Sequence, residues 1–303
     1  MILFKQMLIF FIIMLLGFYM GKKRILNEAV GKSISWIVVN LANPALIISG
    51  CLSLERPMKE EELLYVLLVA VSLFSLLIIL AHLMPHLFST KGSEAGAYQV
   101  MLVFSNFGFM GMPLLSAMYG SKALILASLF MIPFDTLIYT YGVTVIGRKK
   151  EEKLPVKNIC NVGTLACILT VIVAMRNIKI PDYIGSLIIM LSNLTAPLSM
   201  LVIGASMVEM PVVDILKNKR LIIFTAVRMI LLPLAAGFLI KTFVKGNELQ
   251  AVSLILFAAP VASMTAMLAR QYEGNYETTS QAVALTTLVS VVTMPLIFAL
   301  TGI

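Results

Sequence analysis

Residues 104–119 read FSNFGFMGMPLLSAMY and lie inside a longer apolar segment, 95–118. Within this segment, Asn106, Gly108, Gly111 and Pro113 follow each other closely. Proline lacks a backbone donor and clashes with the preceding turn, and glycine weakens a helix further. A helix that breaks in hydrocarbon persists only where protein or a water-filled cavity surrounds the break. The stretch therefore predicts a broken transmembrane helix, which is typical of transporter substrate sites.

The composition is that of a polytopic membrane protein. Hydrophobic residues make up 60% of the 303 residues and charged residues only 13%, whereas soluble domains are about a quarter charged. The formal net charge of +8 comes from basic residues in short loops, so it does not indicate binding to nucleic acid. Two histidines and three scattered cysteines form no metal or disulfide pattern. The first apolar segment lacks a cleavage site and is interpreted as a retained helix.

Ten hydrophobic segments follow one another with short loops, each near the roughly 20 residues needed to span a bilayer. They cover approximately residues 4–21, 31–52, 62–88, 95–118, 122–147, 157–176, 182–207, 218–244, 249–270 and 278–301. The polar sequence RKKEEKLPVK at 148–157 is the longest linker, and we predict that it is cytoplasmic. It divides the chain into two halves, 1–147 and 158–303. We predict an all-α membrane protein with five transmembrane helices in each half.

The distribution of lysine and arginine orients these helices. Fourteen basic residues fall on the loops of one side and eight on the loops of the other. Because the richer side faces the cytoplasm, both termini are predicted to be extracytoplasmic. The predicted location is the plasma membrane, which the chain crosses many times.

An odd number of helices places the two halves in opposite orientations, which predicts an inverted repeat. The sequence carries traces of one: Asn-Leu-x-x-Pro opens the second segment at Asn40 and the seventh at Asn193. An offset of 153 to 154 residues also aligns Asn106–Phe107 with Ala259–Pro260. The ninth segment therefore has a proline where the fourth has its break.

At these residues the sequence resembles the auxin efflux carrier family, which includes bacterial malate-type permeases and the plant PIN carriers. N-x-x-x-M-G-x-P-L-L-x-A-M-Y-G at 106–120 is similar to the motif of the family's helix 4. AAPVASMTAMLARQY, ending at Tyr272, is similar to that of helix 9, and VRMILLP at Val227–Pro233 to that of helix 8. Ser105 stands where the plant carriers have proline, so we attribute this break to the glycines and to Pro113.

The resemblance implies ten helices in two inverted five-helix repeats. Helices 1, 2, 6 and 7 would form a scaffold domain, and helices 3–5 and 8–10 a transport domain in which helices 4 and 9 cross at their breaks. It further implies an elevator-like motion of one domain past the other, dimerisation through the scaffold, and organic-anion substrates.

The predicted substrate site is built mainly from backbone. The second half of a broken helix presents free N–H groups and a positive dipole end, and two such ends can hold a carboxylate. The alternatives are an interhelical hydrogen bond for Asn106 and ordinary packing for the glycines, prolines and other asparagines. The candidate substrate-binding residues are Asn106, Gly108, Gly111, Pro113, Ala259, Pro260, Ser263, Thr265, Asn43 and Asn193.

Two charged residues inside the predicted helices are candidates for ion coupling, because intramembrane charges are costly and usually functional. Asp135 could bind a proton or a sodium ion, or pair with Arg228. Arg228 could face the transported anion or brace Asp135. No cofactor and no metal are predicted.

We predict a secondary carrier for a small organic anion, such as a monocarboxylate, a dicarboxylate or an auxin-like aromatic acid. The alternative is a channel or membrane sensor with the same fold, since broken helices also line channels. The sequence resembles no phosphate loop, catalytic triad or metal cluster, so neither an ATP-driven pump nor an enzyme is indicated. The predicted partners are the anion, the lipid bilayer and a second copy of the chain.

Overall fold

The computed structural model describes residues 2–54, 57–147, 159–209 and 217–303. These residues form helices, joined by short turns and one isolated β-bridge. The predicted linker at 148–157 lies outside the described residues.

The helices fall where the ten hydrophobic segments predict them. Their bounds are α1 (Ile2–Lys22), α2 (Glu28–Ile37), η1 (Val38–Ala42), α3 (Asn43–Ser49), α4 (Glu60–Leu87), α5 (Gly92–Val103), η2 (Phe107–Gly111), α6 (Met112–Leu137), η3 (Ile138–Gly142), α7 (Val143–Ile146), α8 (Val162–Arg176), α9 (Asp182–Ser192), α10 (Thr195–Ser206), η5 (Met207–Glu209), α12 (Lys219–Ala226), η6 (Val227–Leu231), α13 (Leu232–Phe243), α14 (Asn247–Ala258), α15 (Ser263–Gln271) and α16 (Tyr276–Thr301). The elements η1, η2, η3 and η6 are π-helical turns that continue a neighbouring α-helix.

Seven helical stretches among the described residues are long and apolar enough to cross a membrane. One of them, Phe107–Ile146, contains 40 residues and bends at Gly120, whose φ of 68° lies in the left-handed region. Glycine tolerates this backbone conformation because it has no Cβ atom. The bend separates the fourth predicted segment from the fifth.

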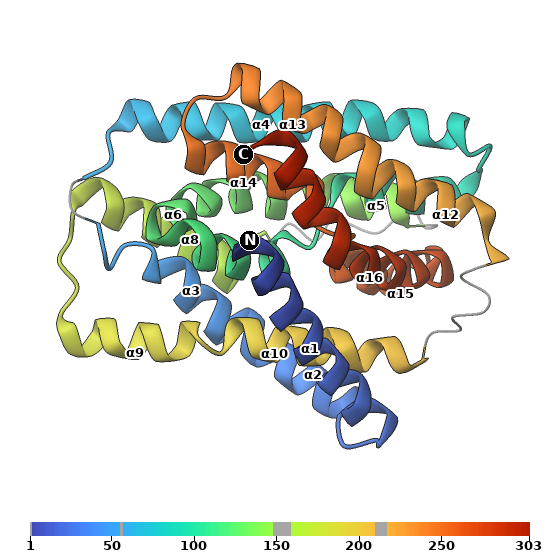
Figure 1. Ribbon diagram of the computed structural model, residues 1–303, viewed down its shortest axis with the longest axis horizontal. Coiled ribbons are helices and arrows are strands. Elements are labelled where there is room, and N and C mark those ends of the chain that lie inside the picture. The colour runs from blue at the N-terminus through green and yellow to red at the C-terminus, as the bar shows by residue number, and fades with distance from the viewer. Residues whose placement is uncertain (1, 55–56, 148–158, 210–216) are drawn as a thin grey trace.

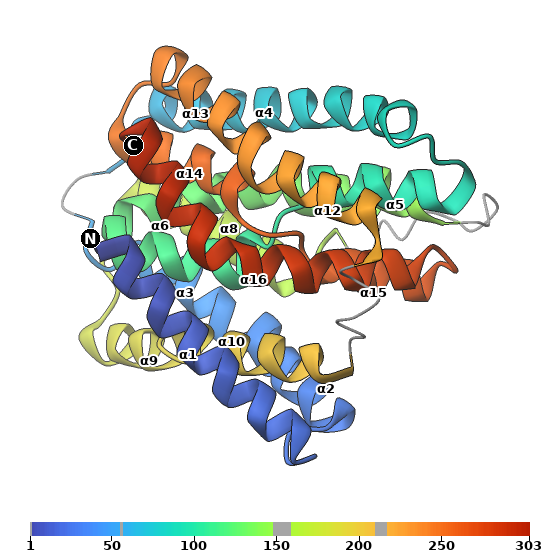
Figure 2. The same ribbon diagram turned by 45° about the vertical axis from the view of Figure 1, so that its right-hand side comes forward.

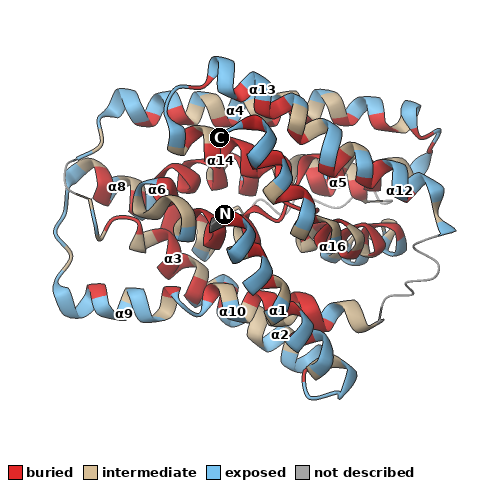
Figure 3. Ribbon diagram, viewed as in Figure 1, coloured by how far each residue is buried: buried red, intermediate tan, exposed pale blue. Residues whose placement is uncertain are grey.

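The helices are arranged in layers. In both ribbon views, α1, α2, α9 and α10 lie along one side of the molecule, α4 and α13 lie along the opposite side, and α6, α14 and α16 run between them (Figures 1 and 2). Burial follows the same order: the middle helices are mostly buried, whereas the outer helices present exposed residues (Figure 3). The site described below lies in the buried middle layer.

The exposed residues of the outer helices are largely apolar. Leu8 and Leu15 of α1, Tyr183 and Met190 of α9, and Phe243 of α13 all expose large hydrophobic side chains. A soluble monomer rarely exposes extended apolar surface. This outer surface is therefore suited to lipid.

The close crossing of α1 and α10 depends on small residues. A Cβ atom added at Gly204 would overlap the carbonyl oxygen of Met14, and one added at Gly17 would overlap that of Leu201. Small residues let helix backbones approach closely, which is the usual mode of helix association in membranes. The two glycines thus determine how tightly the first helix packs against the seventh predicted segment.

Candidate functional site

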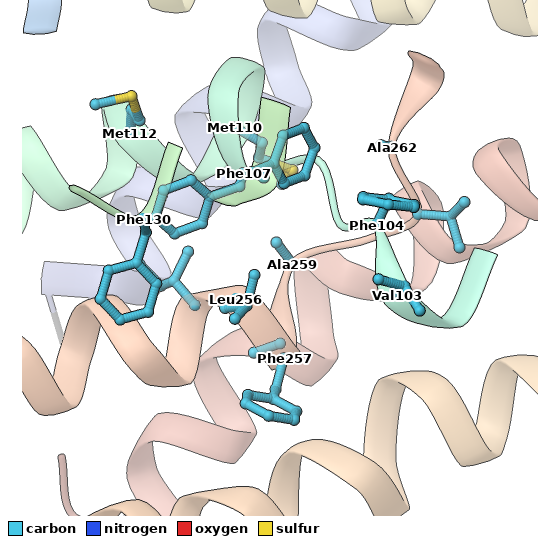
Figure 4. Close-up of a cluster of buried hydrophobic side chains, with 14 of the residues drawn as sticks. Val103, Phe104, Phe107, Met110, Met112, Phe130, Leu256, Phe257, Ala259 and Ala262 are labelled. Carbon is cyan, nitrogen blue, oxygen red and sulfur yellow. The ribbon is translucent and has the colours of Figure 1, made fainter. Parts of the chain in front are cut away.

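Two helices are interrupted in the middle layer, and their interruptions touch. α5 ends at Val103 and helical structure resumes at Phe107, while α14 ends at Ala258 and α15 begins at Ser263. The two extended segments run antiparallel and form a β-bridge between Ser105 and Val261. Figure 4 shows these segments where they carry Phe104 and Ala262.

Backbone hydrogen bonds join the two interruptions. The N–H of Asn106 donates to the carbonyl of Pro260 at 2.7 Å, and the N–H of Ala262 donates to the carbonyl of Phe104 at 3.0 Å. The N–H of Val261 donates to Oγ1 of Thr286 on α16 at 3.1 Å. Buried backbone groups need such partners. Backbone groups of each interruption therefore hydrogen-bond to backbone groups of the other. Thr286 on α16 supplies a further acceptor.

The first interruption precedes the glycines and Pro113, to which the sequence analysis attributes it. The N–H groups of Met110 and Gly111 both donate to the carbonyl of Asn106 at 3.1 Å, which places the glycines in a wide helical turn. Pro113 lies where the π-helical turn η2 passes into α6, inside the continuous helical stretch that begins at Phe107 and after the interruption. The attribution was wrong because the pairing with Pro260 and Ala262, rather than weak helix formers, holds this segment extended.

Gly111 has a packing role instead. A Cβ atom at this position would lie 2.8 Å from Cγ2 of Ile255 on α14, closer than real side chains approach. Glycine thus permits the close approach of the segment after the first interruption to α14.

The start of η2 is polar, buried and incompletely hydrogen-bonded. Asn106 is the N-cap residue, is only 2% exposed, and has no partner for Nδ2. The N–H of Phe107 donates to the carbonyl of Ser105 at 2.7 Å, whereas the next N–H groups of the helix, including that of Gly108, have no partner within their own helix. A Cβ atom at Gly108 would lie 3.6 Å from Nδ2 of Asn43, whose Oδ1 also has no partner. The structure therefore brings Asn43 to the first interruption.

Two further hydroxyl groups with unsatisfied hydrogen bonding lie on α10, which packs against η2. Thr195 and Ser199 are buried, and neither hydroxyl has a hydrogen-bond partner. Neither residue is among the candidates predicted from the sequence, although Thr195 lies inside the repeated motif and Ser199 follows it by two residues. Asn193 itself is exposed at the end of α9, so it does not join these buried groups.

The start of α15 forms the other side of the crossing. Ala259 and Pro260 are buried in the extended segment, and Ser263 is the half-buried first residue of the helix. Thr265 is buried, and its hydroxyl donates to the carbonyl of Ala262 at 2.7 Å. These four candidate residues thus surround the second interruption.

Asp135 and Arg228 have separate partners. Oδ2 of Asp135 accepts hydrogen bonds from Oγ1 of Thr164 at 2.8 Å and from Nδ2 of Asn161 at 3.3 Å. Nη1 of the fully buried Arg228 donates to the carbonyl of Phe257, one of the last carbonyls of α14, which lack partners within their helix. The alternative that pairs Asp135 with Arg228 is therefore wrong, because each is held by another helix.

Interrupted helices that meet inside a bundle with apolar outer faces are typical of membrane transporters. Comparison with known proteins agrees: the sequence profile of a family described as membrane transport protein matches residues 2–156 and again residues 147–298. The chain belongs to this family, which confirms its resemblance to the auxin efflux carriers. It is thus a multi-pass membrane transport protein and not an enzyme.

An uncharacterized transporter of Methanocaldococcus jannaschii is 27% identical to the chain over 308 aligned positions. The alignment covers 95% of this chain and 96% of that transporter. The similarity therefore extends over both halves.

Proposed function

We propose that the protein is a secondary carrier that binds a small organic anion where its two interrupted helices cross. The observation that carries this proposal is the start of η2, where Nδ2 of Asn106 is buried without a partner among the described residues, close to the N–H of Gly108, one of the first backbone donors of the helix. Donors without acceptors are suited to a carboxylate. The candidate residues at both interruptions would contribute backbone N–H groups to the carboxylate and form the walls of its binding site.

The electrostatics of the crossing favour an anion. A helix N-terminus carries about half a positive elementary charge and stabilises a nearby anion by roughly 0.3–2 kcal/mol. Two such N-termini, those of η2 and α15, begin directly after the paired extended segments. Their combined attraction would select a carboxylate and still allow its release, as a carrier requires.

The proposal includes ten transmembrane helices in two inverted repeats. The twofold match of the family profile supports it. The scaffold domain would contain α1, α2, α3 and α8–α10, and the transport domain α4–α7 and α12–α16. An elevator-like motion would move the second domain past the first.

Polar side-chain contacts at α8 and at α2 join these proposed domains. Asp135 on α6 accepts a hydrogen bond from Thr164 on α8, and Arg270 on α15 lies 3.4 Å from Glu28 on α2. Both contacts would have to break when the transport domain moves. Protonation of Asp135 would remove its charge and weaken its contact with α8, so this residue is the proposed coupling group for a proton gradient.

The proposed setting is the plasma membrane, with both termini outside and two copies of the chain joined through their scaffold domains. The exposed apolar side chains of Tyr183 and Met190 on α9 are suited to lipid or to such a dimer contact.

Counterflow in sealed proteoliposomes tests the carrier function. Vesicles are loaded with unlabelled butyrate, benzoate or succinate, and uptake of the same labelled acid is followed. A carrier exchanges internal for external substrate, so internal acid should increase the initial uptake of at least one of them. Uptake that internal substrate does not increase would instead support the channel alternative.

A further inference from the structure

The most unusual buried side chain outside the paired backbone segments is that of Arg228. Its exposed fraction is 0%, and Nη1 donates to the carbonyl of Phe257. The other two donor nitrogens, Nε and Nη2, are buried without a partner in the part of the chain that the structure describes. A buried charge with unsatisfied donors is strongly unfavourable unless something negative lies nearby.

No carboxylate among the side chains that the structure describes fills this role. Among the side chains whose burial the structure describes, Asp135 is the only buried acidic one. Its Oδ2 is held by Thr164 and Asn161 at the start of α8, and no ion pair joins it to Arg228. The positive charge of Arg228 is therefore not neutralised by this acid.

The position of Arg228 makes the crossing more positive. Phe257 belongs to the last turn of α14, where unpaired carbonyls carry a partial negative charge. The guanidinium at this end offsets that charge. The N-termini of η2 and α15, which follow the interruptions, are positive. The negative C-terminus of α14 no longer offsets them, because Arg228 neutralises it.

The position in the first half that corresponds to Arg228 is not a cation. Phe74, which lies 154 residues before Arg228, packs edge-on against Phe134 with ring centroids 6.2 Å apart. Phe134 in turn packs against Phe104 at 5.5 Å. Aromatic rings thus surround the end of α5, whereas a guanidinium caps the end of α14, so among the described residues these two helix ends have one positive side chain and not two.

We propose that Arg228 supplies the single fixed positive charge of the anion site, which therefore accepts singly charged carboxylates and discriminates against dicarboxylates. This inference rests on the proposed function. One carboxylate leaves the site neutral and provides acceptors for Nε and Nη2. A second carboxylate would remain as an uncompensated charge inside the membrane, where charges are costly.

The first test uses the wild-type protein in detergent and follows its thermal unfolding with acids of matched size: butyrate against succinate, and benzoate against phthalate. Near neutral pH, the monocarboxylate of at least one pair should bind at least about tenfold more tightly than its dicarboxylate. Binding of succinate should strengthen when the pH is lowered enough to form its singly charged species. Equal or tighter binding of the doubly charged acids would overturn the inference and leave the proposed function standing. If no acid stabilised the protein, the proposed function and this inference would both be contradicted.

The second test compares variants. Arg228→Gln should lose at least about tenfold in affinity for the preferred monocarboxylate, and Arg228→Lys should retain the preference for single charge with weaker binding. Lys241→Gln is the matched control, because Lys241 lies on α13 and donates to the carbonyl of Thr301 at 2.8 Å. If folded Arg228→Gln protein kept both the affinity and the discrimination of the wild type, Arg228 would have a structural role only. If Arg228→Gln does not fold, the inference is still tested by the selectivity of the wild type for single charge and by the affinity of Arg228→Lys.

Discussion

Substrate exchange by the Asn106→Ala variant is expected to fall at least about tenfold, while the protein remains folded. The side-chain amide of Asn106 is buried and its Nδ2 has no partner among the described residues. A hydrogen bond to a charged group contributes about 1.5–3 kcal/mol, which corresponds to this loss in binding. The backbone N–H that donates to Pro260 is still present in the variant, so the crossing itself should persist. Initial rates of counterflow in proteoliposomes measure the effect.

Two further variants separate binding from structure. Asn106→Asp has nearly the same shape but loses the amide donors and adds a negative charge, so it should exchange no better than Asn106→Ala. Asn40→Ala is the control, because Nδ2 of Asn40 donates to the carbonyl of Trp36 in its own helical segment at 2.9 Å. Unchanged exchange by Asn106→Ala would remove this residue from the site.

The second large effect is expected from a cross-link between the two proposed domains. In a variant without native cysteines, Glu28→Cys and Arg270→Cys are joined by a bifunctional thiol reagent about as long as an arginine side chain. The native side chains lie 3.4 Å apart, so the reagent should connect them. If the transport domain must move past the scaffold, cross-linked protein should lose nearly all exchange, which is measured in proteoliposomes with the uncross-linked variant as reference.

The chain offers a matched control for this experiment. Lys122 and Glu248 form a similar ion pair at 3.3 Å, but both residues belong to the proposed transport domain. The same reagent applied to Lys122→Cys with Glu248→Cys should leave exchange intact. Normal exchange by protein cross-linked between Glu28→Cys and Arg270→Cys would contradict the elevator motion.

Sequence patterns predict the helical segments and the two interruptions because both depend on local chemistry. Apolar runs of spanning length define the helices, and Pro260 indicates the second interruption directly. The first interruption lies earlier than the glycines suggest, at Phe104–Asn106. Its position depends on hydrogen bonds to a segment more than a hundred residues away, which no local pattern reveals.

The partners of charged and polar side chains were less predictable for the same reason. Asp135 and Arg228 are the two charges that hydropathy singles out, but their partners on α8 and α14 follow from helix packing. Asn43 lies inside the first copy of the repeated motif and Asn193 begins the second, yet Asn193 is exposed whereas Asn43 lies near Gly108. Thr195 and Ser199 were missed because hydroxyl residues are common in transmembrane helices and give no distinctive signal.

A structure of the protein determined with the carboxylate that stabilises it most would test the central claim most directly. We predict density for the carboxylate within hydrogen-bonding distance of Nδ2 of Asn106 and of the backbone N–H groups at the start of η2. Density for the acid at another place, with the crossing of the two interrupted helices unoccupied, would contradict the account.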